Sequence, residues 1–211
     1  MRVLLDDLTD RVERLRAAHS NRRVLIGIAG PPGAGKSTLA GALVSRLGGG
    51  CVHVPMDGFH LADAALDRLG LRDRKGAPET FDAEGYAALL DRVARGEPVW
   101  APGFERTLEQ PLAQSIWVDE ATQVVVSEGN YLLLSEPRWQ AVRKVFDEVW
   151  FCDLDDDLRR ERLVKRHVEF GKPPEEARAW VDRVDEPNAA LVKESAHLTD
   201  LHVDMAELRG W

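Results

Sequence analysis

The segment from Gly30 to Ser37 reads G-P-P-G-A-G-K-S, which fits the phosphate-binding pattern G-x-x-x-x-G-K-[ST]. Its glycines let the backbone take turns that a side chain would block, so that successive N–H groups can point at an anion. Lys36 is expected to reach the β- and γ-phosphates, and the Ser37 hydroxyl is expected to bind Mg²⁺. Phosphate contacts are therefore expected from Gly30, Pro31, Gly33, Ala34, Gly35, Lys36, Ser37 and Thr38.

The residues on either side of this loop strengthen the interpretation. An apolar run over residues 24–29 precedes the loop and is typical of a buried strand, and residues 38–47 follow it with helical periodicity. The amino end of that helix would face the phosphates, because its free N–H groups and its dipole favour negative charge. The loop and its flanks predict a nucleoside triphosphate and Mg²⁺ as ligands, but they do not indicate the fate of the γ-phosphate.

The composition is typical of a soluble globular protein. The chain has 211 residues, of which 44% are hydrophobic and 30% charged, and its formal net charge is −8. This acidic balance argues against nucleic acid as a partner. No apolar stretch is long enough for a membrane span, and no signal peptide is evident. We expect one domain over residues 1–211, located in the cytoplasm, and the sequence does not predict its oligomeric state.

Apolar runs alternate with helical patterns along the chain. Strands are predicted over residues 23–29, 51–55, 124–127, 148–152 and 201–203. Helices are predicted over residues 3–19, 38–47, 82–95, 135–144, 155–168, 174–184 and 187–196. This alternation predicts an α/β fold with a parallel sheet that helices cover on both faces. Ligands of such sheets bind at the carboxyl ends of the strands.

Two carboxylates stand where predicted strands end. Asp57 comes just after the strand over 51–55, and Glu128 closes the strand over 124–127. Phosphoryl transfer often needs a base for the attacking hydroxyl, and Asp57 is suited to that role. Alternatively Asp57 serves a turn, since Asp-Gly is a common turn pair. Glu128 has the place of an acid that holds Mg²⁺, and its alternative is a surface residue at a strand end.

Several segments together resemble one family, the P-loop kinases of the phosphoribulokinase, uridine kinase and bacterial pantothenate kinase group. They are G-P-P-G-A-G-K-S-T (30–38), M-D-G-F-H (56–60), R-K-G-A-P-E-T-F-D (74–82), P-G-F-E-R (102–106), E-G-N-Y-L-L (128–133) and R-L-V-K-R (162–166). The resemblance implies a three-layer P-loop NTPase fold, with a mostly parallel five-stranded sheet, helices on both faces and a helical lid over about residues 155–185. It also implies ATP and Mg²⁺ as cofactors.

The resemblance assigns roles to the donor side of the site. It makes Asp57 the catalytic carboxylate that accepts a proton from the substrate hydroxyl, and Glu128 the Mg²⁺-associated acid. Arg162 and Arg166 match lid arginines that act, with Lys36, on the phosphates. The spacing agrees, because residues i and i+4 lie on one helix face and two guanidiniums there could neutralise a phosphoryl group. The alternative is a solvated basic face, since other basic residues crowd this helix.

In contrast to the donor side, the acceptor side is indicated by the resemblance alone. The segments that border the family's acceptor site contain His60, Arg74, Phe81, Phe104, Arg106 and Asn188. Two phenylalanines could wall a pocket, and the histidine and arginines could bind hydroxyls or a carboxylate. Each residue has an ordinary alternative, as core, solvated loop or first-turn residue.

The predicted function is an ATP-dependent kinase that transfers the γ-phosphate to a hydroxyl of a nucleoside, a sugar or a pantothenate-like alcohol. Uridine kinases carry a Tyr-Asp pair where this chain has Phe104-Glu105, which argues against a pyrimidine nucleoside. The alternative is a nucleotide-dependent regulatory ATPase that binds a protein partner. A GTPase switch is disfavoured, because none of the asparagines at 21, 130 and 188 begins an Asn-Lys-x-Asp motif.

Overall fold

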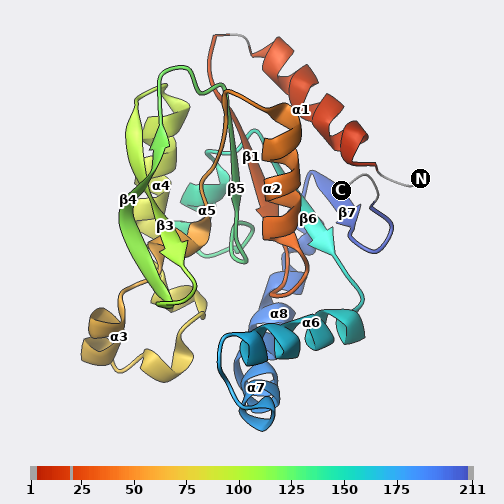
Figure 1. Cartoon of the computed structure of the whole chain (residues 1–211). Helices are drawn as coiled ribbons and strands as arrows, with labels where there is room; N and C mark the ends of the chain where they lie inside the picture. The colour runs from red at the N-terminus through yellow and green to blue at the C-terminus, as the bar shows by residue number, and fades with distance from the viewer. Residues whose placement is uncertain (1–3, 20, 209–211) are drawn as a thin grey trace.

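The computed structural model describes residues 4–19 and 21–208, and its centre is a sheet of five strands, all paired in parallel (Figure 1). The strands run in the order β2 (Cys51–His53), β5 (Val124–Glu128), β1 (Val24–Ala29), β6 (Glu148–Asp153) and β7 (Leu201–Asp204). The strand that enters the phosphate-binding loop is therefore the middle one. This arrangement confirms the predicted parallel sheet. Strand β2 is shorter than predicted, and Pro55 has no N–H to extend the ladder.

Two apolar layers sandwich the sheet because successive side chains of each strand point to opposite faces. Ile26 and Ile28 pack with α1 (Leu5–Ala18) and α2 (Lys36–Leu47) on one face, whereas Leu25 belongs to the cluster on the other face. That second cluster draws buried side chains from α4 (Ala83–Ala94), α5 (Pro137–Arg143) and α8 (Glu186–Glu194). The predicted three-layer fold is confirmed. The predicted start of α1 at residue 3 lies outside the described residues.

An antiparallel hairpin stands beside the main sheet and was not predicted. It pairs β3 (Val99–Glu105) with β4 (Gln110–Val118), and a short helix α3 (Asp63–Leu69) precedes it along the chain. The hairpin packs against the turn Met56–Phe59 that follows β2. The contact is so close that a side chain at position 58, where the chain has Gly58, would clash with the Pro102 carbonyl. The hairpin thus forms one wall next to the carboxyl end of the sheet (Figure 1).

The predicted lid is helical and lies at the carboxyl end of the sheet (Figure 1). It consists of α6 (Asp156–Glu169), α7 (Pro174–Trp180) and a π-helical turn, Val181–Asp185, that runs directly into α8. A break was expected before Pro187, but the helical path continues. A wide π turn tolerates the proline, which would otherwise clash with the carbonyl four residues earlier. In the part of the chain that the structure describes, no helix could span a membrane.

Candidate active site

The phosphate-binding loop joins β1 to α2 and takes a path that needs glycine. Gly33 and Gly35 have φ angles of +80° and +97°, in the left-handed region that side chains rarely adopt. At Gly30 a Cβ atom would lie 2.7 Å from the Cys152 carbonyl oxygen on the neighbouring strand. The sequence therefore folds here into a tight loop that brings backbone N–H groups to the start of α2, a geometry that binds phosphate.

Lys36 is buried at the start of α2. Its Nζ donates to the Pro31 carbonyl at 3.0 Å and to Asn130 Oδ1 at 2.7 Å. Burial lowers the pKa of Lys36, and the negative charges of Glu128 and Asp57 oppose that shift. Asn130 was not predicted as a site residue, although it follows Glu128 in the E-G-N-Y segment. The pair of contacts holds the ammonium group inside the loop, where phosphates would bind.

Ser37 and Glu128 meet at the predicted magnesium site. The Ser37 hydroxyl donates to Glu128 Oε1 at 3.0 Å, and Glu128 is buried at the end of β5. Burial and the nearby Asp57 charge raise the pKa of Glu128, while Lys36 opposes the rise. Within the described ranges no group of three or more His, Cys, Asp or Glu could hold a metal. Two hard oxygen donors fit Mg²⁺, which usually takes one or two carboxylates and completes its shell with phosphates and water.

Asp57 lies in the 3-10 turn after β2 and faces the same region. Its carboxylate is partly exposed, and the nearest cation is Arg106, whose Nη2 lies 3.7 Å from Asp57 Oδ2. The described residues donate no hydrogen bond to this carboxylate, so the turn does not use it as a cap. Neither oxygen therefore accepts a hydrogen bond from the described residues, although Oδ2 is paired with Arg106.

One cavity of about 330 Å³ joins the donor and acceptor residues. Lys36, Ser37, Asp57 and Glu128 line it, and so do the predicted acceptor residues His60, Phe81, Phe104, Arg106 and Asn188. Arg74 is the exception, because its exposed side chain pairs with Glu79 at 2.6 Å. Its neighbours Arg72 and Lys75 line the cavity instead, and both are held by Asp63 at 2.7 Å.

His60 sits between the two predicted wall aromatics. Its ring centroid lies 3.9 Å from that of Phe81 and 5.3 Å from that of Phe104. Burial lowers the pKa of His60 to about 4, which keeps the imidazole neutral at physiological pH. Its buried Nδ1 has no hydrogen-bond partner among the described residues. The neutral ring thus forms part of the aromatic wall and carries one buried nitrogen that has no hydrogen-bond partner among the described residues.

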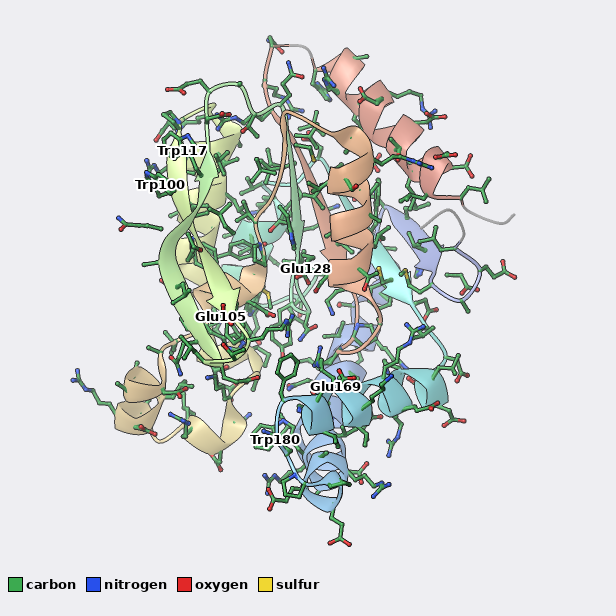
Figure 2. All side chains as sticks on the ribbon, viewed as in Figure 1. Trp100, Glu105, Trp117, Glu128, Glu169 and Trp180 are labelled. Atoms are coloured by element: carbon green, nitrogen blue, oxygen red, sulfur yellow. The ribbon has the colours of Figure 1, made fainter. Side chains whose placement is uncertain are left out.

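The lid arginines lie over the phosphate loop. Arg162 and Arg166 line a second cavity of about 590 Å³ together with Gly35, Lys36 and Thr38. Arg166 and Arg106 line both cavities, so guanidiniums from the lid and from the hairpin approach the same region. Figure 2 shows Glu128 at the carboxyl end of the sheet, above the lid elements that carry Glu169 and Trp180.

Two further lid residues, which were not predicted, line the same cavity as Asp57. His167 Nε2 lies 2.8 Å from Asp185 Oδ2, and both side chains are largely buried. Asp185 ends the π turn, so its position depends on a local geometry that helical periodicity does not reveal. This pair extends the polar lining of the cavity from the sheet to the lid.

Comparison with known proteins agrees with this geometry. The model of the phosphoribulokinase / uridine kinase family matches residues 25–207. A Schizosaccharomyces pombe protein, provisionally named a uridine kinase, is 34% identical over 97% of this chain and 92% of its own length. The uncharacterized protein YggC of Escherichia coli is 33% identical, over 92% of this chain and 82% of its own.

Solved structures share the fold. A Silicibacter protein, described provisionally as a fructose transport system kinase, has a TM-score of 0.85 and 33% identity, covering 94% of this chain and 98% of its own. YFH7 of Saccharomyces cerevisiae has a TM-score of 0.84 at 19% identity, covering 99% and 100%. Because the family model spans most of the chain and a relative matches nearly its full length, the chain belongs to the phosphoribulokinase / uridine kinase family of P-loop kinases.

Proposed function

We propose that this protein is a kinase that transfers the γ-phosphate of ATP to a hydroxyl group of a small molecule. The observation that carries the proposal is the single cavity that Lys36 and Ser37 line from the phosphate loop and Asp57 lines from the turn after β2. A kinase must hold donor and acceptor in reacting geometry. Here phosphate-binding groups and an available carboxylate face the same space.

In this proposal the charged residues of the site have separate roles. Asp57 accepts the proton of the attacking hydroxyl, and the Arg106 guanidinium lies 3.7 Å from its carboxylate. Ser37 and Glu128 would hold Mg²⁺, which supplies charge neutralisation on the phosphates. Arg162 and Arg166 stabilise the charge that spreads over the transferring group.

The size and lining of the cavity support a small acceptor. A volume of about 330 Å³ stands at the low end for ligand pockets, and a γ-phosphate beside Lys36 would take part of it. Phe81 and Phe104 supply apolar walls, while His60 and Asn188 supply neutral polar groups suited to hydroxyls. The names of two relatives refer to uridine and fructose, both of which carry hydroxyl groups. We therefore favour a sugar-like or similarly small alcohol over a bulky acceptor.

An acceptor screen tests the proposal. ATP consumption would be measured across nucleosides, sugars, sugar acids and vitamin-like alcohols, with the phosphorylated product identified by mass spectrometry. We expect one class to give a product, and we expect Lys36→Ala to weaken both ATP binding and transfer because it removes the charge on the β- and γ-phosphates. Slow ATP hydrolysis that no acceptor changes, together with affinity for a protein partner, would instead support a regulatory ATPase.

A further inference from the structure

Arg159 is buried in α6, which is unusual for an arginine. Its side chain is 1% exposed, and its guanidinium has three partners on three segments. Nε donates to Asp156 Oδ1 at 3.1 Å, Nη1 to the Pro32 carbonyl at 3.3 Å, and Nη2 to Glu186 Oε1 at 2.6 Å. A buried charge is costly unless it is paired and hydrogen-bonded, so this side chain is tolerated because its partners surround it.

The phosphate loop packs directly on the backbone of α6 at this residue. A Cβ atom at Gly33 would lie 3.0 Å from the Arg159 carbonyl oxygen and 2.8 Å from Leu163 Cγ. The bond from Arg159 to Pro32 is therefore one part of a close loop-to-helix contact. Because the Arg159 guanidinium and the Pro32 carbonyl are both buried, the position of the loop depends on the position of this turn of the helix.

Arg159 is linked to the lid arginines through its own helix and to the acceptor wall through its partner Glu186. Arg162 stands three residues later on the same helix and Arg166 seven residues later, and both line the cavity over the phosphate loop. Glu186 begins α8, two residues before Asn188, which lines the acceptor cavity. Arg159 itself is not among the residues that line either cavity.

We propose that Arg159 is a positioning residue, which fixes the lid arginines and the start of α8 relative to the phosphate loop. The planar guanidinium bonds the phosphate loop at Pro32 and α8 at Glu186, and its third bond, to Asp156, holds it against the first turn of α6. The arginines that act on the transferring phosphoryl group are thereby held in place before a ligand arrives. This inference rests on the proposed function, because it takes the γ-phosphoryl group as the target of Arg162 and Arg166.

The adjacent Arg160 is a matched control. It also reaches Glu186, at 3.2 Å, and it pairs with Asp182 at 2.6 Å, but its side chain is 42% exposed. Within the described part of the chain it forms no hydrogen bond or ion pair with the phosphate loop. Arg160→Met therefore removes a positive charge from the same helix, and with it an ion pair to the same glutamate, while the contact between Arg159 and the phosphate loop stays intact.

The test compares the affinities of MgADP and of MgADP with aluminium fluoride, a mimic of the transferring phosphoryl group. We expect Arg159→Met to keep MgADP affinity within about threefold and to weaken the aluminium fluoride complex at least about tenfold, as the loss of one charge-assisted hydrogen bond would. Arg160→Met should change neither affinity by more than about threefold. Equal losses for the two ligands, or no loss, would show that Arg159 is merely structural and would overturn the proposal.

A second variant covers the case in which Arg159→Met does not fold. Glu186→Gln keeps an oxygen acceptor for Arg159 and removes only the charge, so we expect the same selective loss in a weaker form. An unchanged ratio of the two affinities in this variant would overturn the proposal as well. Neither ligand needs an acceptor, so this result is independent of an acceptor screen that finds no phosphorylated product.

Discussion

The contact between the phosphate loop and the lid helix predicts a specific cost for Gly33→Ala. Gly33 has a φ of +80°, where a residue with a Cβ costs about 1–2 kcal/mol. The new Cβ would lie 2.8 Å from Leu163 Cγ and 3.0 Å from the Arg159 carbonyl oxygen. Relieving that overlap moves backbone as well as a side chain, and such overpacking costs about 1–3 kcal/mol. Together these effects predict a loss of about 2–5 kcal/mol in the free energy of unfolding.

Gly96→Ala separates the two contributions. Gly96 has a nearly identical φ of +83°, and nothing lies within 4 Å of a Cβ built there. This variant should lose only the backbone part, about 1–2 kcal/mol. Urea unfolding would measure both variants, and MgADP binding should weaken only in Gly33→Ala. If Gly33→Ala were no less stable than Gly96→Ala, the close packing of α6 on the loop would be refuted.

Other expectations follow from individual buried groups. Arg23→Met should lower the free energy of unfolding by about 3–5 kcal/mol in urea titrations, because its buried guanidinium bonds four backbone carbonyls. The pKa of His60 is about 4 in the folded state against an ordinary 6.5, so its neutral form adds stability above pH 6.5. That contribution, roughly 3 kcal/mol, should disappear as pH falls toward 4, and His60→Phe should lack this slope. Glu128→Gln should raise the Mg²⁺ concentration needed for ATP binding about tenfold in calorimetric titrations, and an unchanged requirement would contradict the metal assignment.

The main sheet could be predicted because its three central strands, β1, β5 and β6, are short and mostly apolar, whereas the hairpin could not. Pro102 stands inside β3 and Pro111 inside β4, so neither segment shows a clean alternation. Most of β4 is exposed or half-buried, which removes the apolar signal that marked the other strands. Both β3 and β4 also contact the turn at Met56–Phe59, and those contacts are not local in sequence.

The clustering of Lys36, Ser37, Asp57 and Glu128 could be predicted because these groups follow strands directly, and parallel strands bring their carboxyl ends to one edge. Neighbouring residues of like charge could not be told apart. Arg159 is buried and Arg160 exposed, although both lie on the same basic helix. Likewise Arg74 points away from the cavity that Lys75 lines. Burial of one of two adjacent basic residues is decided by tertiary packing, which composition and periodicity do not encode.

The central claim is that Asp57 is the base that accepts the proton of the acceptor hydroxyl during phosphoryl transfer. One comparison tests it most directly. With the acceptor that the screen identifies, the rate of phosphoryl transfer and the MgATP affinity would be measured for the wild type and for Asp57→Ala. We predict that the variant binds MgATP within about threefold of the wild type and transfers phosphate at least about 100-fold more slowly, the usual cost of losing a general base. Transfer at a near-normal rate to that acceptor would contradict the account.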